Sequence, residues 1–177
     1  MRLVICVTFH YVEHRRTHLR KSTAHFPLLA DHVELAIFTN ASKPVQVESI
    51  LDSLPRAENL SARVHSVRKL SHPYLLTWAH KKYLRHVATS RRDVDAFMYI
   101  EDDIEILPTT FNYWFSERET LRPFGLYPSF FRFEKHPETG NLISVDIEAP
   151  MDLSQLPRIE IRDNLHYYNF SNAYQAM

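Results

Sequence analysis

Strand and helix patterns alternate along the first hundred residues, and this alternation constrains the fold more than any other feature of the chain. Short apolar runs rich in β-branched and aromatic residues are typical of buried strands, and segments with helical periodicity separate them. A strand, a helix and another strand in succession build a parallel sheet whose crossover helices cover its faces. The predicted strands lie at residues 3–9, 33–38, 62–67 and 97–100. We therefore predict an α/β fold in the order βαβαβαβ, a Rossmann-type, mostly parallel sheet flanked by helices.

Proline and hydroxyl residues mark where the intervening helices begin. Pro44 occupies the first turn of a helix predicted to run to Leu54, and Ser71 caps a helix with Pro73 in its first turn. A stripe of Val47, Ile50, Leu51 and Leu54 is predicted to face the core. After Pro108, a Thr caps a short helix that is predicted to end near residue 118.

The last third of the chain predicts a small antiparallel extension. Residues 130–134 and 142–147 flank a turn-rich stretch at 135–141, as in a hairpin, and 158–161 is another short strand. The tail at 169–177 has the pattern of the first turns of an apolar helix, with Ser171 as its cap.

Composition narrows the class of protein. A chain of 177 residues fits one domain. Its 21 Lys and Arg balance 21 Asp and Glu, so no global field draws the protein to nucleic acid or to an anionic membrane, and partners must be inferred from local patches. The single cysteine, Cys6, rules out an internal disulfide and fits a reducing, cytoplasmic location. The apolar opening is too short for a membrane span, and with 2 Gly the chain has neither a GxGxxG motif nor a P-loop.

Three consecutive carboxylates, Glu101, Asp102 and Asp103, end the fourth predicted strand. Two carboxylates about 6 Å apart at an effective dielectric constant of about 20 repel each other by roughly 3 kcal/mol, so the triplet calls for a counter-charge. A divalent cation is the simplest one, and hard oxygen ligands favour Mg²⁺ or Mn²⁺ over Zn²⁺. The alternative is a surface turn with solvated acids.

Polar residues also follow the first two predicted strands. Arg15, Arg16 and Arg20 come after the first strand, where a diphosphate would meet them at the carboxyl edge of a parallel sheet. They are equally compatible with a solvated helix face. Asn40, after the second strand, has an amide that could read a nucleobase, and Asn is also a common turn residue.

The triplet resembles the Glu-Asp-Asp form of the DxD motif in nucleotide-sugar glycosyltransferases of the GT-A fold, particularly the N-acetylglucosaminyltransferase I type. The similarity covers about residues 72–115 and continues past the triplet through Ile104, Glu105, Pro108 and the aromatic residues Phe111, Tyr113, Trp114 and Phe115. It implies a single GT-A-like domain over 1–177, with a nucleotide-sugar-binding half at 1–103 and an acceptor-side half at 104–177. Because only 74 residues follow Asp103, the acceptor half is either abbreviated or incomplete.

The resemblance also implies roles for individual residues. Asp103 would bind Mn²⁺ or Mg²⁺, Asp102 would support the ribose or the waters of the metal, and Glu101 would bind hydroxyls of the donor sugar. The helix before the fourth strand adds His72, Trp78 and His80 as candidates, which are otherwise packed structural residues. The predicted nucleotide-sugar site consists of Phe9, His10, Tyr11, Arg15, Arg16, Asn40, His80, Glu101 and Asp102.

The predicted function is metal-dependent transfer of a sugar from a nucleoside diphosphate sugar, UDP-linked, to a hydroxyl of a glycan or another acceptor. An inverting transferase needs a carboxylate base near the acceptor hydroxyl. Glu134 is the first choice, followed by Asp146, Glu148 and Asp152. Two alternatives stay open: a metal-dependent phosphohydrolase or nuclease that uses the triplet, and a non-catalytic nucleotide-sugar-binding module of the same fold.

Overall fold

The computed structural model describes residues 1–68, 70–130, 132–144, 158–162 and 165–168. By its internal contacts the chain divides into two compact units, Met1–Pro128 and Ser129–Met177. The predicted division into halves at residue 103 stays a prediction.

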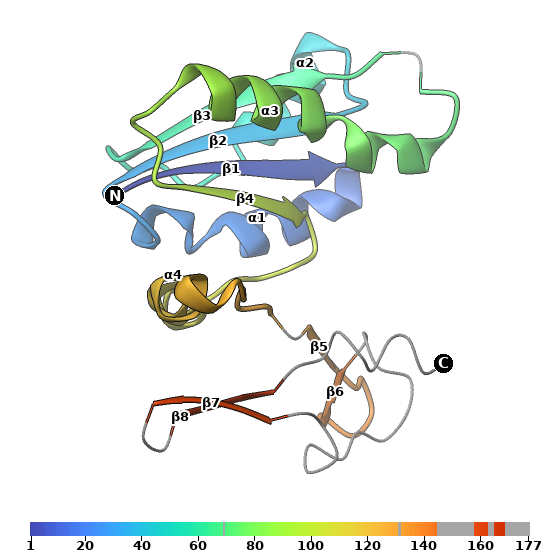
Figure 1. The fold of residues 1–177 in the computed structure, drawn as a ribbon. Coiled ribbons are helices and arrows are strands. Elements are labelled where there is room, and N and C mark those ends of the chain that lie inside the picture. The colour runs from blue at the N-terminus through green and yellow to red at the C-terminus, as the bar shows by residue number, and fades with distance from the viewer. Residues whose placement is uncertain (69, 131, 145–157, 163–164, 169–177) are drawn as a thin grey trace. The chain divides into compact units, whose positions relative to one another are not determined.

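The first unit is built on a four-stranded parallel sheet with the strand order β3-β2-β1-β4 (Figure 1). Its strands are β1 (Arg2–Phe9), β2 (His32–Thr39), β3 (Leu60–Ser66) and β4 (Ala96–Glu101). β1 pairs with both β2 and β4, and its residues from Leu3 to Phe9 are buried. β1 is apolar at almost every position because a central strand that is covered on both faces needs apolar side chains on both. The predicted α/β fold with a mostly parallel sheet is confirmed.

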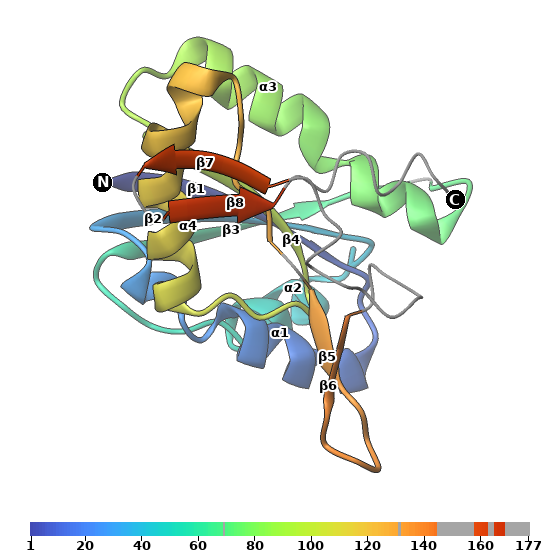
Figure 2. The same cartoon turned by 60° about the horizontal axis from the view of Figure 1, so that its bottom comes forward.

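Helices cover both faces of this sheet. The elements between the strands are η1 (Glu13–Arg15), α1 (Arg16–Thr23), η2 (Phe26–Leu28), α2 (Pro44–Leu51), η3 (Pro73–Trp78) and α3 (His80–Ser90), and α4 (Pro108–Leu121) and η4 (Arg122–Phe124) follow β4. Figures 1 and 2 show α3 on one face and α1 on the opposite face. Among the described residues, no helix is long and apolar enough to cross a membrane.

The core lies mainly on the α1 face. Alternate residues of β1 from Leu3 to Phe9 pack there with Leu19 of α1, Ile50 of α2 and Phe111 of α4. On the other face Cys6 joins Ala36 and Phe38 of β2 beneath Tyr83 and Leu84 of α3. The period of two along β1 therefore divides its side chains between two layers of helices.

Two details of the predicted helices need correction. The helix expected to begin at Ser71 starts as the 3₁₀ helix η3, and it is capped by His72, whose Nδ1 accepts a hydrogen bond from the backbone N–H of Tyr74 at 3.3 Å. α2 ends at Leu51 rather than at Leu54, and Leu51, expected in the core, is 41% exposed whereas Ile50 and Leu54 of the same stripe are buried.

The second unit contains two short antiparallel pairs. β5 (Phe133–Lys135) pairs with β6 (Leu142–Ser144), and β7 (Arg158–Arg162) pairs with β8 (Leu165–Tyr168). Gly140, with φ of 71°, closes the turn between β5 and β6 in the left-handed region that glycine tolerates. The predicted antiparallel extension is confirmed, although β5 is shorter than expected and β8 was not predicted. The predicted helix in the tail lies outside the described residues.

Candidate functional site

The strand order creates a topological switch point at the carboxyl ends of β1 and β4. From β1 the chain proceeds to β2 on one side, whereas β4 pairs with the other side of β1. Open α/β sheets bind ligands in the crevice outside the carboxyl ends of their strands at such a point. Here it brings Arg15, six residues after β1, next to the acidic triplet that ends β4.

A bidentate ion pair between Arg15 and Asp102 lies at the centre of this edge. The Arg15 guanidinium donates from Nε to Oδ2 of Asp102 at 3.0 Å and from Nη2 to Oδ1 at 2.9 Å. Asp102 is only 3% exposed. Burial raises the pKa of the Asp102 carboxyl, and the Arg15 contact acts in the opposite direction. Arg15 therefore supplies a counter-charge for the triplet within the protein itself, which sequence reasoning had not assigned to it.

Asp103 is the more open of the two aspartates. Arg15 Nη2 also donates to Oδ2 of Asp103 at 3.1 Å, and the Asp103 side chain is 46% exposed. The backbone N–H of Ile104 donates to the carbonyl of Glu101 at 3.2 Å and closes the turn that presents both aspartates.

The donor set at this turn fits a hard divalent cation held jointly with a ligand. Mg²⁺ typically takes one or two carboxylates and completes its coordination with substrate phosphates and water. Arg15 holds both carboxylate oxygens of Asp102 but contacts Asp103 at Oδ2, so Oδ1 of Asp103 is the oxygen left for that role. Among the described residues there is no group of three or more His, Cys, Asp or Glu side chains that could hold a metal ion.

A hollow of about 270 Å³ opens between this edge and η3. Residues from β1, η1, η3 and β4, and from the turns beside them, line it: Thr8, His10, Arg15, Pro73, Tyr74, Leu76, Thr77, Glu101, Asp102 and Asp103. Thr8 is paired in register with Glu101 and is 5% exposed. Its hydroxyl is buried against Tyr99: burial raises the pKa of the Tyr99 phenol, and the contact with Thr8 acts in the opposite direction.

A second hollow of about 610 Å³ continues along the same edge. It shares His10 and Pro73 with the first and is also lined by Asn40, Ser42, Val67, Arg68 and Leu70. The Asn40 amide oxygen accepts a hydrogen bond from the backbone N–H of Tyr11 at 2.7 Å. Because the Asn40 amide oxygen already accepts this hydrogen bond, the amide nitrogen is the group through which Asn40 would contact a nucleobase.

Several predicted site residues have structural contacts instead. Phe9 is fully buried in the core, and its ring lies edge-on to Tyr11 with centroids 6.0 Å apart. Arg16 donates from Nε to the Ser53 hydroxyl at 3.1 Å and forms an ion pair with Glu13. Neither Phe9 nor Arg16 lines the two hollows.

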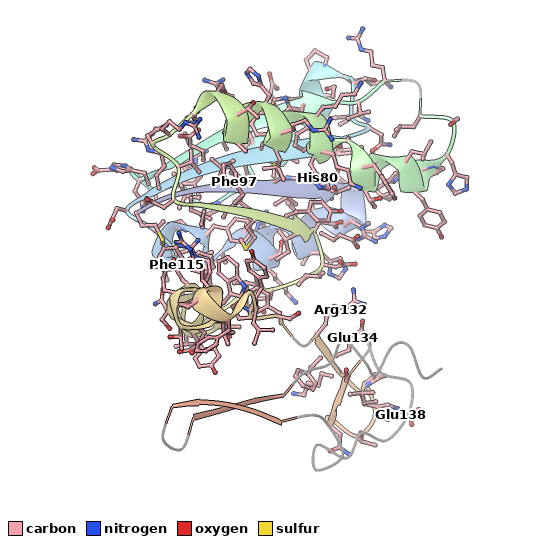
Figure 3. All side chains as sticks on the ribbon, in the orientation of Figure 1. His80, Phe97, Phe115, Arg132, Glu134 and Glu138 are labelled. Atoms are coloured by element: carbon pink, nitrogen blue, oxygen red, sulfur yellow. The ribbon has the colours of Figure 1, made fainter. Side chains whose placement is uncertain are left out.

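His80 lies on the α3 face of the sheet, against β4. Its ring stacks on Tyr99 with centroids 3.8 Å apart, and only 7% of the residue is exposed. Burial lowers the pKa of His80, which favours the neutral form of its ring. Figure 3 shows His80 and Phe97 on this side of the sheet. These contacts give His80 a packing role in the described structure.

The proposed catalytic bases belong to the second unit. Glu134 is exposed on β5 (Figure 3), while Asp146, Glu148 and Asp152 lie outside the described residues. The identity of the base stays a prediction.

Sequence reasoning missed Thr8, Arg68 and the residues of η3 that line the hollows. Thr8 could have been found, since a hydroxyl near the carboxyl end of a predicted central strand is already at the expected ligand edge. The residues of η3 line the hollow because the segment between β3 and α3 passes over this edge of the sheet. The periodicity of the sequence does not predict the course of such a segment.

Comparisons of the chain with family models, with curated proteins and with solved structures found no match. The fold and the geometry of the carboxyl edge are therefore the observations on which a function can be argued.

Proposed function

We propose that this protein is a nucleotide-sugar-dependent glycosyltransferase that transfers a sugar from a nucleoside diphosphate sugar, UDP-linked, to an acceptor hydroxyl. One observation carries the proposal: a cation, Arg15, and an open carboxylate, Asp103, lie together at the switch point of a parallel sheet. Two hollows that share His10 and Pro73 lie beside them; the one of about 610 Å³ has the size of a small-molecule site, and the one of about 270 Å³ is slightly smaller.

Each end of a nucleotide sugar finds suitable chemistry along this edge. The Arg15 guanidinium would bind diphosphate oxygens, for which its planar fork of donors is suited. The Asn40 amide nitrogen would donate to a carbonyl of the base, and Glu101 would accept from hydroxyls of the donor sugar. Asp102 would act through Arg15, because both of its carboxylate oxygens already hold that guanidinium.

Asp103 would hold Mn²⁺ or Mg²⁺ together with the diphosphate. When bound, such an ion acts as a Lewis acid that neutralises negative charge developing on the leaving nucleoside diphosphate. Arg15 already contacts Oδ2 of Asp103, so the guanidinium lies beside the position at which that charge would develop.

The acceptor would be a glycan or another hydroxyl compound, and its deprotonation needs a carboxylate. Glu134, Asp146 and Glu148 remain the proposed candidates for this base. Substituting each by Gln or Asn and measuring transfer at saturating donor would separate them, since loss of the base lowers kcat more than donor affinity.

Calorimetry of UDP binding in Mn²⁺, repeated with a chelator, tests the proposal. We expect UDP affinity to fall at least about tenfold on chelation and in Asp103→Asn, because the metal bridge would be lost. The matched control is Asp52→Asn, an exposed aspartate on the end of α2 that should bind UDP like the wild type.

Equal UDP affinity with and without chelator contradicts the metal-bridge part of the proposal. Release of UDP from UDP-sugars only when an acceptor is present supports transfer. Hydrolysis of a nitrophenyl phosphate with Mg²⁺ would instead identify a phosphohydrolase, and donor binding without turnover would identify a binding module.

A further inference from the structure

The charges of this neutral chain are unevenly distributed along its sequence. Residues 59–92 contain none of its 21 Asp and Glu residues. The same stretch includes Arg63, Arg68, Lys69, Lys81, Lys82, Arg85, Arg91 and Arg92. It forms β3, η3 and α3. Arg91, just after α3, is paired with Glu34 and Asp93, and the other cations make up the run of like charge. Such a local field attracts an anionic partner even though the net charge is zero.

Exposed apolar side chains lie within the same stretch. Tyr74, Leu75 and Trp78 of η3 are 77%, 47% and 62% exposed. Sequence reasoning favoured a packed Trp78, whereas the indole stands at the surface with the Lys81 ammonium 3.5 Å from its ring centroid. Three large exposed apolar residues within five positions mark an interaction surface rather than ordinary surface composition.

The cations and the apolar side chains share one concave surface. Arg68, Leu75, Trp78 and Lys82 line the same hollow of about 500 Å³, and no carboxylate lines it. In the part of the chain that the structure describes, no ion pair involves Arg68, Lys81 or Lys82. We call Arg68, Tyr74, Leu75, Trp78, Lys81 and Lys82 the η3 patch.

We propose that the η3 patch binds the surface of a membrane that contains anionic lipids. Tyr and Trp favour the boundary between lipid headgroups and acyl chains, Leu enters the acyl region, and Lys and Arg attract anionic headgroups. The protein would lie on the bilayer without crossing it.

Two other anionic partners fit the patch less well. Protein sites for acidic sugars bind hydroxyls through side-chain carboxylates and amides, and residues 60–92 contain no Asp, Glu, Asn or Gln. Single-stranded nucleic acid stacks its bases on open aromatic faces. In the η3 patch Lys81 covers one face of Trp78, the Tyr74 ring lies against His72 with centroids 4.9 Å apart, and Leu75 offers no stacking surface.

Co-sedimentation with vesicles tests the proposal. We expect the full chain to bind vesicles containing phosphatidylserine and not vesicles of phosphatidylcholine alone, and to be released by high salt. Lys81→Gln with Lys82→Gln should lower the partition coefficient about 30-fold, roughly fivefold for each lysine. Leu75→Ser with Trp78→Ser should lower it by at least about tenfold at the same charge.

The matched control is Lys21→Gln with Arg56→Gln, which removes two exposed cations outside the patch and should bind vesicles like the wild type. Thermal melting of every variant verifies folding, and all the substituted patch residues are exposed. Failure to bind phosphatidylserine vesicles, or equal losses in the patch and control variants, overturns the proposal. Tight binding of a single-stranded oligonucleotide without vesicle binding would assign the patch to nucleic acid instead.

Discussion

Replacing Arg15 by Ala tests whether the Arg15 and Asp102 pair holds the candidate site together. The variant leaves a carboxylate whose side chain is 5% exposed without its bidentate partner. Removing one member of a buried ion pair typically costs 3–5 kcal/mol, because the remaining charge is desolvated and unpaired. The Arg15 side chain is 34% exposed, so water partly replaces it, and we expect a loss on the order of 3 kcal/mol at neutral pH. This corresponds to a fall in Tm of about 10 °C.

The loss should depend on pH in a defined direction. Burial already raises the folded-state pKa of Asp102, and removing Arg15 raises it further, above that of the wild type. A raised carboxyl pKa favours the folded state below the unfolded pKa of about 4, and that contribution disappears as pH rises through the folded pKa. The difference in unfolding free energy between Arg15→Ala and the wild type should therefore be largest at neutral pH and shrink on acidification.

Urea denaturation at several pH values measures this difference. Asp102→Asn in the Arg15→Ala background should recover most of the lost stability, since the uncompensated charge is then gone. Arg16→Ala is the control, because its guanidinium contacts a hydroxyl and an exposed glutamate and its loss should cost only about 1 kcal/mol. Tyr11 and Arg16 both lower the pKa of Glu13, so the Arg16→Ala loss should also shrink on acidification, but by much less than the Arg15→Ala loss because Glu13 is exposed. An Arg15→Ala loss that is the same at every pH, or one that Asp102→Asn deepens, refutes the argument.

Three further predictions concern other groups. Asp103→Asn should abolish Mn²⁺-dependent UDP binding while leaving Tm unchanged or slightly raised, because an open carboxylate beside other acids adds repulsion; a collapsed fold would indicate a structural role. Arg91 lowers the pKa of Glu34 and brings that of Asp93 to about 2, so the stability that these contacts add is present above the unfolded pKa of about 4 and is lost as pH falls toward 2. In urea titrations the wild type should lose its advantage over Arg91→Ala across that interval, and a constant difference would contradict it. Burial raises the pKa of the Cys6 thiol to about 12, so a disulfide reagent at pH 8 should label it only after unfolding, and rapid labelling of the native protein would disprove its burial.

The fold could be predicted because it depends on local patterns of apolar and polar residues in the sequence. The apolar run of β1 and the acidic end of β4 predict a parallel sheet with ligand chemistry at its carboxyl edge, and the structure places Arg15, Glu101, Asp102 and Asp103 at that edge. His10 and Asn40, which were also predicted to bind the nucleotide sugar, line the adjoining hollow.

The details of the site depend on contacts between distant segments, which no local pattern fixes. Asp102 and Arg15 are 87 positions apart, and their pairing depends on β4 lying beside β1 rather than beside β3. Arg15 and Arg16 have the same side chain and adjacent positions, so the sequence does not distinguish them. In the structure the Arg15 side chain contacts Asp102 at the site, and the Arg16 side chain contacts Ser53. The exposed Trp78 was misjudged for a related reason, because an indole at helical spacing has the same pattern whether or not another element covers it.

The position of β4 in the sheet has a consequence for how the protein matures. During synthesis on a ribosome β1, β2 and β3 emerge in that order, and each new strand can pair with the one before it. β4 is the last of the four strands to emerge, and it must pair with the free edge of β1, the strand made first. At its amino end the Asp95 backbone N–H donates to the carbonyl of Arg2, and the Asp95 carboxylate accepts from the Arg2 backbone N–H. A nascent chain thus has a nearly complete sheet before Arg15 and Asp102 can meet. A ligand that binds at this edge therefore stabilises only chains in which β4 has paired with β1. Adding such a ligand should slow amide hydrogen exchange in β4 before it slows exchange in the other strands.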